Sequence, residues 1–398
     1  MAPLLMMAEH HEAYFAWKRA GVKDAWCWHV DAHLDVGTDG LGEDRLLQLR
    51  SCSHEQQAQQ RGLCGNAYLP WGGLHCGNYL LPSLREGLVG RLTWVLPSWL
   101  VRQPLLPWAR LHLQGWLDLR LDDYASLQDR GGYIEGVLEG VPFQMGCQEN
   151  LPAPDRPVLL DIDLDFFLTE AGEVWLQPDG FPRPESQFTT LALSVSGGYT
   201  PESQLGLAEP FGRGFPRPSE GPLDLASRWI RVGRYAEAQA WLEKHSAAPV
   251  VERNYLLGTC LQQQKHYSEA LGLWQELLKF PLPYDGRAYV LGLCAECLSA
   301  LQRPGEALQC LSQVELPDYR CLWAMSRLYE ELEQGRAAAQ ALRRASTLAE
   351  GRLFSLQIRY QLACLYRKQG KEGLARMELA ALEQLDRTGE LRSLTLLR

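Results

Sequence analysis

The stretch that decides the fold of this 398-residue chain is Trp28-His29-Val30-Asp31-Ala32-His33-Leu34-Asp35. It follows an apolar run, which predicts the end of a buried strand. Because strand side chains alternate between faces, Asp31, His33 and Asp35 are expected to point the same way. Two carboxylates and an imidazole buried together are costly unless they are paired. A divalent metal ion would offset that cost, and oxygen-rich ligation with an imidazole suits Mn²⁺; the alternative is a hydrogen-bond network at a strand end.

The residues before this stretch predict a β-α-β unit. We expect a strand over residues 4–9, a helix over 13–20 and a second strand over 26–33. Such a unit implies parallel strands joined by a right-handed crossover. His11 then follows the first strand at the same edge of the sheet as Asp31, and open α/β sheets carry their sites at that edge.

A second acidic run follows the apolar residues 158–160. Asp161, Asp163 and Asp165 alternate with Ile162 and Leu164, so the three carboxylates are expected on one strand face. Like charges at this spacing repel one another and do not all ionise unless a cation lies among them. This run therefore predicts metal binding.

Two glycine-rich segments are candidate loops around a site. The first holds His75, a candidate proton shuttle, and Asn78, a candidate substrate donor. The second is the turn Ser196-Gly197-Gly198-Tyr199, where Tyr199 is a candidate substrate contact. An ordinary role in loop structure is the alternative for each residue. Short strands are also predicted over residues 92–96, 111–113 and 190–194.

The second half of the chain has a repeat. Residues 213–222, rich in Pro and Gly, predict a linker between a domain at 1–212 and a helical domain at 223–398. Alanines recur at 238, 270, 307, 339 and 375, each shortly after a turn, with spacings of 32, 37, 32 and 36. A helix-turn-helix unit of about 34 residues is the tetratricopeptide period, so an all-α solenoid is expected.

Composition limits the compartment and the partners. The net charge of −9 argues against a broad nucleic-acid interface. Eleven cysteines, an odd number scattered along the chain, favour a reducing cytoplasm. No apolar run is long enough to span a membrane. The sequence leaves the oligomeric state open.

The order of these motifs resembles the ureohydrolase superfamily of arginases and agmatinases. Asp31-Ala32-His33-Leu34-Asp35 matches its D-A-H-x-D element, and the acidic run at 161–165 contains its D-x-D. The Glu9-to-Glu12, 160–167 and 197–201 segments look like the small branch of peptide arginases. The resemblance covers residues 1 to about 205, and it implies a three-layer arginase/deacetylase-like parallel sheet.

The resemblance also implies roles for residues. Two Mn²⁺ ions would be held by His11, Asp31, His33, Asp35, Asp163 and Asp165. Asp161 would support the ligands, although Asp161 and Asp163 are the alternative ligand pair. A proton for the leaving amine would come from Asp35 or His75. The substrate guanidinium would pair with Glu202 or, as the second choice, with Glu12.

The predicted function is a dinuclear manganese hydrolase. It would convert arginine residues in a ribosomally made precursor peptide to ornithine and release urea. Two alternatives remain: a deacetylase or other amidohydrolase on the same fold, which would bind a single zinc, and a non-catalytic tetratricopeptide scaffold.

Overall fold

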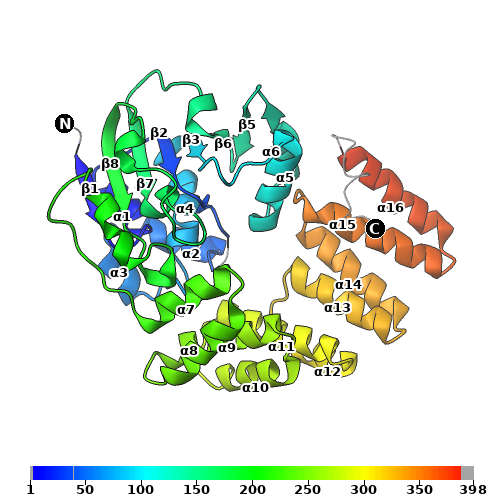
Figure 1. Ribbon diagram of the computed structural model, residues 1–398. Coiled ribbons are helices and arrows are strands. Elements are labelled where there is room, and N and C mark those ends of the chain that lie inside the picture. Colours follow the sequence, from blue (N-terminus) through cyan, green and yellow to red (C-terminus); the bar gives the residue numbers. More distant parts are fainter. Residues whose placement is uncertain (1–2, 39, 387–398) are drawn as a thin grey trace. The chain divides into compact units, whose positions relative to one another are not determined.

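The computed structural model describes residues 3–38 and 40–386 (Figure 1). The chain forms two compact units. The sheet unit comprises residues 1–117 and 127–264, and the repeat unit comprises residues 118–126 and 265–398.

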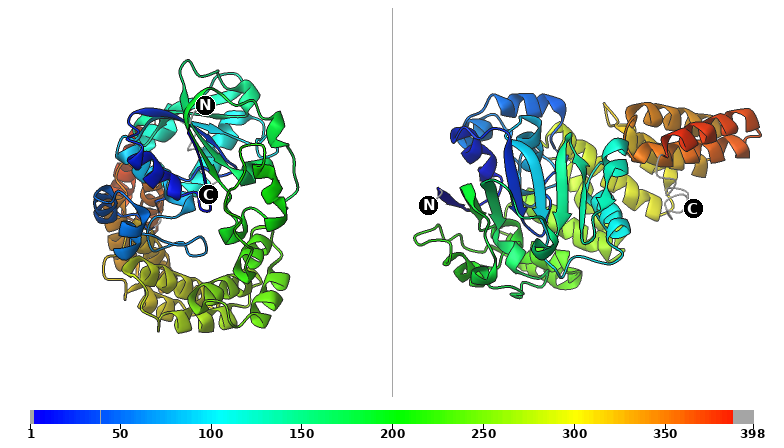
Figure 2. Two further views of the ribbon diagram at one scale, coloured as in Figure 1. Left: turned by 90° about the vertical axis from the view of Figure 1, so that its left-hand side faces the viewer. Right: turned by 90° about the horizontal axis from the view of Figure 1, so that it is seen from above.

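The sheet unit is built on one eight-stranded sheet with the order β1-β8-β7-β2-β3-β6-β5-β4. Figure 2 shows the sheet from two further directions. The strands are β1 (Leu4–Met7), β2 (Ala25–Val30), β3 (Val89–Val95), β4 (Gln128–Asp129), β5 (Tyr133–Leu138), β6 (Val141–Gly146), β7 (Val158–Asp163) and β8 (Ser186–Ala192). Neighbours from β1 to β6 in this order run parallel, and β5 and β4 join the edge antiparallel. The prediction of an α/β fold with a mainly parallel sheet is confirmed.

The central strands are β2 and β7, and every residue of both is buried. Strands that are buried along their whole length in this way belong to parallel sheets that are covered on both faces. From β2 the chain continues to β3 on one side, whereas from β7 it continues to β8 on the other. The order of strands therefore reverses between β2 and β7, and such a reversal opens a crevice at the carboxyl ends of the strands.

Helices and short 3-10 segments complete the sheet unit. Its α-helices are α1 (Glu12–Arg19), α2 (Glu43–Arg50), α3 (Glu55–Gln60), α4 (Leu80–Arg85), α5 (Leu105–Trp116), α7 (Pro222–Arg231), α8 (Tyr235–Lys244) and α9 (Val250–Gln263). Its 3-10 segments are η1 (Cys76–Asn78), η2 (Gln148–Asn150), η3 (Leu164–Phe167), η4 (Pro178–Gly180), η5 (Ser196–Gly198) and η6 (Glu202–Ala208). Helices α1 and α2 both contact α4.

The strand predicted at 111–113 is wrong, because these residues lie within α5. Leu105, Ala109 and Leu113 are all buried, and their spacing of four places them on one helix face. The helical spacing of the buried residues determines the structure here, and the short apolar run at 111–113 does not form a strand.

The repeat unit is all helical. It contains α6 (Leu121–Ser126), α10 (Tyr267–Leu277), α11 (Tyr284–Ala300), α12 (Pro304–Leu311), α13 (Tyr319–Glu331), α14 (Gly335–Leu348), α15 (Phe354–Lys368) and α16 (Glu372–Leu385). From α10 to α16 each helix contacts the next. The marker alanines 270, 307, 339 and 375 are buried in α10, α12, α14 and α16, and Ala238 is buried in α8. The helical repeat is confirmed.

The compact units divide the chain at different residues from the predicted linker. Helices α7 to α9 belong to the sheet unit. Asn66 Nδ2, for example, donates to Glu252 Oε1 of α9 at 3.0 Å. Residues 118–126 belong to the repeat unit, where Leu353 N donates to Leu119 O at 2.8 Å. The predicted limits 1–212, 213–222 and 223–398 remain predictions from composition.

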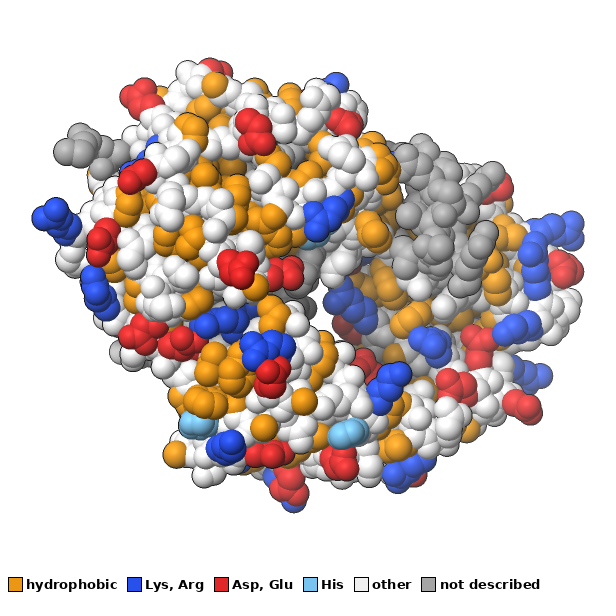
Figure 3. Space-filling model, in the orientation of Figure 1, with side chains coloured by type: hydrophobic (Ala, Val, Ile, Leu, Met, Phe, Trp, Pro, Cys, Tyr) orange, Lys and Arg blue, Asp and Glu red, His pale blue; other side chains and the backbone are white. Residues whose placement is uncertain are grey.

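The surface carries charges of both signs. On the face shown in Figure 3, acidic and basic side chains lie interspersed, with no extended basic patch among the residues described there. Among the described residues, no helix is both long and apolar enough to cross a membrane.

Candidate metal centre

Asp31 and Asp35 are brought together by a turn after β2, and not by the alternation of side chains along a strand. Strand β2 ends at Val30, so the predicted continuation to His33 is wrong. Asp31 Oδ1 accepts a hydrogen bond from His33 N at 2.7 Å, which closes a tight turn just after the strand. Asp35 has a φ of 54°, a left-handed conformation that few residues other than glycine adopt. The turn brings both aspartates back over the end of the sheet.

The second acidic run begins on β7 and ends on η3. Asp163 is the last residue of β7, and its Oδ1 accepts from Asp165 N at 3.0 Å, which caps η3. Ser194 Oγ donates to Asp163 Oδ2 at 2.6 Å. The cap turns Asp165 toward the same end of the sheet as Asp31.

The first group of potential metal ligands surrounds His10. Its Nδ1 lies 3.2 Å from Asp31 Oδ2, 3.3 Å from Asp35 Oδ2 and 3.0 Å from Asp163 Oδ2. All four side chains are buried. The ligand atoms of His10, Asp31 and Asp35 are close enough together to hold one ion.

The second group lies on the other side of Asp31. His33 Nδ1 is 3.4 Å from Asp31 Oδ1 and 3.0 Å from Asp165 Oδ2. These three residues also form a group that could hold an ion. Asp31 belongs to both groups, through Oδ2 in the first and Oδ1 in the second, so it is placed as a bridging carboxylate would be.

The predicted ligand His11 does not lie in either group. It is the N-cap residue of α1, and its Nε2 is 3.2 Å from Glu55 Oε1. The turn between β1 and α1 sends the side chain of His10 inward instead. The candidate metal-binding histidine is therefore His10 and not His11.

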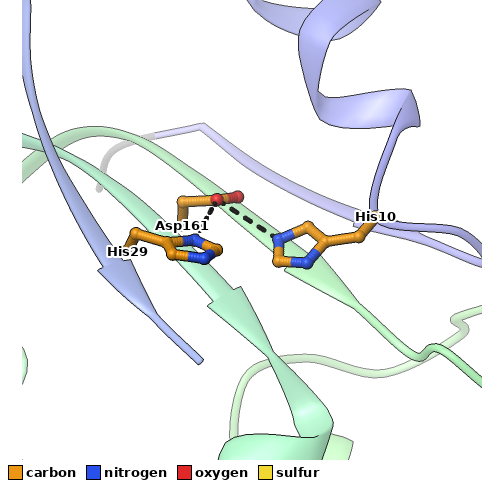
Figure 4. Close-up of side chains that lie close together, drawn as sticks. All are labelled: His10, His29 and Asp161. Atoms are coloured by element: carbon orange, nitrogen blue, oxygen red, sulfur yellow. Dashed lines mark hydrogen bonds and ion pairs between the residues drawn. The ribbon is translucent and has the colours of Figure 1, made fainter. Parts of the chain in front are cut away.

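Asp161 lies between His10 and His29 and contacts both of their rings (Figure 4). Its Oδ2 lies 3.2 Å from His10 Nε2 and 3.0 Å from His29 Nδ1, and it accepts from Tyr79 Oη. Its Oδ1 accepts from Thr190 Oγ1 at 2.6 Å. The ligand atoms of His10, His29 and Asp161 are also close enough together to hold an ion, but both oxygens of Asp161 already have partners. This placement is compatible with the predicted supporting role of Asp161, which stays a prediction.

Contacts at Nε2 orient the ring of His10. Tyr79 Oη donates to Asp161 and lies 2.9 Å from His10 Nε2, which also faces Asp161. His10 Nδ1 consequently faces the carboxylates of the first group. A ring nitrogen held in this way by an outer carboxylate is the usual arrangement for a metal-binding histidine.

His29 has no ring nitrogen left for an ion. Its Nδ1 contacts Asp161, and its Nε2 lies 2.9 Å from the carbonyl oxygen of His33. Burial opposes protonation of His29, but the hydrogen bond to Asp161 and the charge of Asp31 outweigh it and raise the pKa. His29 thus links Asp161 to the turn after β2.

The electrostatics of the two groups favour added positive charge. Burial disfavours protonation of His10 and His33, yet the surrounding carboxylates raise the pKa of both. Burial and the charge of Asp31 raise the pKa of Asp35, and burial and the charge of Asp163 raise the pKa of Asp165. The crowded carboxylates therefore repel one another, and a divalent cation would relieve this repulsion.

Unpaired buried atoms provide a test of whether an ion fits. His10 Nδ1, Asp31 Oδ2 and Asp165 Oδ1 are buried without a hydrogen-bond partner among the described residues. Buried polar atoms are nearly always hydrogen-bonded, so three in one cluster need an explanation. Carboxylate oxygens with two imidazole nitrogens are a suitable donor set for Mn²⁺. The residues present fit such an ion.

The loop with His75 and Asn78 is held together by its own hydrogen bonds. His75 Nδ1 accepts from Gly77 N at 3.1 Å. Asn78 Oδ1 accepts from His75 N at 2.9 Å, and its Nδ2 donates to Gly73 O at 3.0 Å. Burial and the charge of His11 lower the pKa of His75 to about 4. His75 is therefore neutral at pH 7, and both ends of the Asn78 side chain are bound to backbone.

Among the described residues, no hydrogen bond or ion pair joins Glu202 or Glu12, the predicted guanidinium partners, to the two ligand groups. Glu202 is exposed, and its Oε2 accepts from Glu220 N at 2.9 Å. Glu12 Oε1 accepts from Glu9 N at 2.9 Å. Tyr199, by contrast, lies against His33, with ring centroids 5.2 Å apart in an edge-to-face arrangement.

Sequence reasoning missed His10, His29 and Tyr79. His29 could have been found, because alternation along β2 places it on the same face as Asp31. No periodic signal distinguishes His10 from His11, since both follow the end of β1 at Met7. Tyr79 has no signal in the sequence, because it approaches Asp161 only through the fold.

Comparisons with known proteins concern the helical half of the chain. No protein-family model and no curated protein matches this sequence. Solved structures that it resembles include MamA 41-end from Desulfovibrio magneticus RS-1, with 20% identity over 42% of this chain and 94% of that chain, and a TM-score of 0.36. A putative kinesin light chain of Podosopora anserina with nearly identical TPR-like repeats has 18% identity over 41% of this chain and 92% of that chain, with a TM-score of 0.36.

YrrB, described as a TPR protein with an unusual peptide-binding site, has 16% identity over 43% of this chain and 89% of that chain, with a TM-score of 0.35. The kinesin light chain and YrrB structures are both described as TPR or TPR-like proteins.

Proposed function

We propose that this protein is a two-metal hydrolase that acts on the guanidino group of arginine residues within a peptide. The products would be ornithine and urea. The observation that carries the proposal is the sharing of Asp31 between two adjacent groups of potential ligands. Asp31 places one oxygen 3.2 Å from His10 Nδ1 and the other 3.4 Å from His33 Nδ1.

The residues that would hold the ions follow from these distances. His10, Asp31, Asp35 and Asp163 would hold one Mn²⁺, and Asp31, His33 and Asp165 would hold the other. A pair of such ions supplies a water that is nucleophilic at neutral pH, together with a Lewis acid. This chemistry is needed because resonance makes a guanidinium carbon a poor electrophile.

The protein's own groups orient the ligands. Asp161 and Tyr79 contact His10 Nε2, which leaves Nδ1 as the ring nitrogen that would bind the ion. Trp94 Nε1 donates to Asp31 O at 2.9 Å and fixes the turn that carries the shared carboxylate. Asp35 lies within the first group and is the better placed of the two residues proposed to give a proton to the leaving amine.

A carboxylate for the substrate guanidinium is available at Glu9. It precedes His10, and its side chain bonds to Ser196. Burial raises the pKa of Glu9, although the hydrogen bond to Ser196 and the charge of His11 lower it in part. Glu9 therefore replaces Glu202 and Glu12 as the residue that we expect to pair with a cationic substrate.

A peptide rather than free arginine is the proposed substrate. A peptide bond removes the charges of the α-amino and α-carboxyl groups, so the pocket need not satisfy them. The helical repeats favour a polypeptide partner, because stacked helix pairs provide extended binding surfaces. They also favour a second candidate function, a repeat scaffold that binds peptides without turnover.

One experiment distinguishes these functions. The full chain is incubated with Mn²⁺ and an arginine-containing peptide, and urea and peptide mass are measured. The proposal predicts urea and a loss of about 42 Da per converted residue, as expected for hydrolysis at a two-metal site. Free L-arginine and agmatine serve as control substrates. Peptide binding without urea release would support the scaffold, and a higher specificity constant for free arginine would contradict the peptide substrate.

A further inference from the structure

Tyr199 lies on a turn that only glycines can form. Gly197 has a φ of 75° and Gly198 a φ of 72°. A Cβ atom at Gly198 would lie 1.9 Å from the carbonyl oxygen of Asp224. The turn is therefore pressed against helix α7, and it holds the Tyr199 ring edge-to-face against His33 at 5.2 Å.

Helix α7 supplies the hydrogen bonds that shape this turn. The buried Asp224 accepts from Gly197 N at 2.8 Å and from Tyr68 Oη at 2.5 Å through Oδ1. Its Oδ2 accepts from Gly221 N at 2.7 Å and closes the start of the helix. One carboxylate thus joins the N-terminus of α7 to the turn.

Arg231, at the other end of α7, contacts the same turn in two ways. Its Nη1 donates to Gly197 O at 2.6 Å, and its Nη2 donates to Gly198 O. Its guanidinium carbon lies 4.1 Å from the centroid of the Tyr199 ring. The planar guanidinium can bind two carbonyls and stack on an aromatic ring at once, which a lysine ammonium cannot do.

The Tyr199 ring is consequently held between a cation and an imidazole. Arg231 stacks on it, and His33, a residue of the second ligand group, meets its edge. A group that fixes the orientation of a metal-binding histidine affects the site without touching the ion. Arg231 is two contacts away from the candidate centre and lies in the first helix of the repeat sequence.

We propose that Arg231 is a positioning residue, which holds Tyr199 against His33 and so lets helix α7 set the geometry of the candidate metal centre. This inference rests on the proposed function, because it assigns His33 to the centre. It makes the first repeat helix part of the site, although the sequence pattern alone assigns that helix to the repeats.

The test uses the full chain with Co²⁺, whose visible absorption reports the ligand geometry. Arg231→Met and Tyr199→Leu are each expected to change the Co²⁺ spectrum and to lower kcat on an arginine peptide by about 10- to 100-fold, with a smaller change in KM. The double variant R231M/Y199L should be no worse than Y199L alone. Arg231→Lys should restore only part of the loss. Arg234→Met is the matched control, since Arg234 stacks on Trp229 and pairs with Glu237 instead.

The outcomes separate the two proposals. A wild-type chain that binds two Co²⁺ ions, with R231M identical to it in spectrum and kcat, would overturn the positioning role alone. Losses that multiply in the double variant would also overturn it, because Arg231 would then act independently of Tyr199. A wild-type chain that binds no Co²⁺ would overturn the proposed function and this inference together. Thermal unfolding of each variant shows whether the fold is retained.

Discussion

At the scale of single residues, two adjacent histidines have different surroundings. His10 is fully buried among carboxylates, whereas His11 contacts Glu55 at the start of α3. His10→Ala should therefore abolish binding of at least one metal ion and reduce turnover by two orders of magnitude or more, since a ligand is lost. His11→Ala should leave both within a few-fold of wild type. Metal analysis and urea release on the two variants check this, and the reverse order of effects would restore His11 as the ligand.

A second residue, His75, gives a pH dependence. Its pKa in the folded chain is about 4, below the value of about 6.5 expected when it is unfolded. Between these values the unfolded state binds the proton and the folded state does not, so this contribution to stability is present above pH 6.5 and falls as the pH decreases toward 4. His75→Gln should remove it.

Chemical denaturation at pH 7 and pH 4.5 measures the effect. We expect the loss of unfolding free energy between these two pH values to be about 2 kcal/mol smaller in H75Q than in wild type. His54→Gln changes an exposed histidine of the same unit and should behave as wild type. Equal losses in all three chains would show that His75 titrates normally.

At the scale of elements, the turn at 197–198 requires glycine because its backbone has positive φ angles and lies directly against α7. Gly198→Ala would place a Cβ 1.9 Å from the backbone of α7. Gly233 has a similar φ of 77°, but nothing lies within 4 Å of its Cβ position. We expect G233A to cost about 1 kcal/mol and G198A about 3 kcal/mol or more, because only the latter adds a clash with backbone. Denaturant midpoints compare the two, and similar costs would show that α7 does not press on the turn.

The elements also show how far the sequence predicts the site. Asp31 and Asp163 could be predicted because Asp31 follows β2, Asp163 ends β7, and parallel strands end at the same edge of a sheet. The reason given for the first motif was wrong, since Asp35 reaches the cluster through a left-handed turn and not through strand alternation. The support of Tyr79 and Thr190 for Asp161 could not be predicted, because three distant segments meet there.

At the scale of the whole molecule, the division into units predicts what a truncation removes. A chain that ends at Gln264 retains α7 to α9, and with them Asp224 and Arg231. We expect it to hydrolyse a short arginine peptide within a few-fold of wild type but to bind a full-length precursor more weakly, because it lacks the remaining repeats. A chain that ends at Gly221 should lose both activities. Equal losses on both substrates for the longer chain would assign the repeats a purely structural role.

The central claim is that one protein chain holds two metal ions, with Asp31 shared by the two ligand groups and Asp163 in the first of them. The most direct measurement is the metal content of the full chain after loading with Mn²⁺ and removal of excess ion. The account predicts two Mn²⁺ per wild-type chain and a clear loss in Asp163→Asn, with the helical content unchanged by circular dichroism. A single bound zinc would instead favour a deacetylase-type site. A wild-type chain without bound metal, or an Asp163→Asn chain that keeps two ions, would contradict the account.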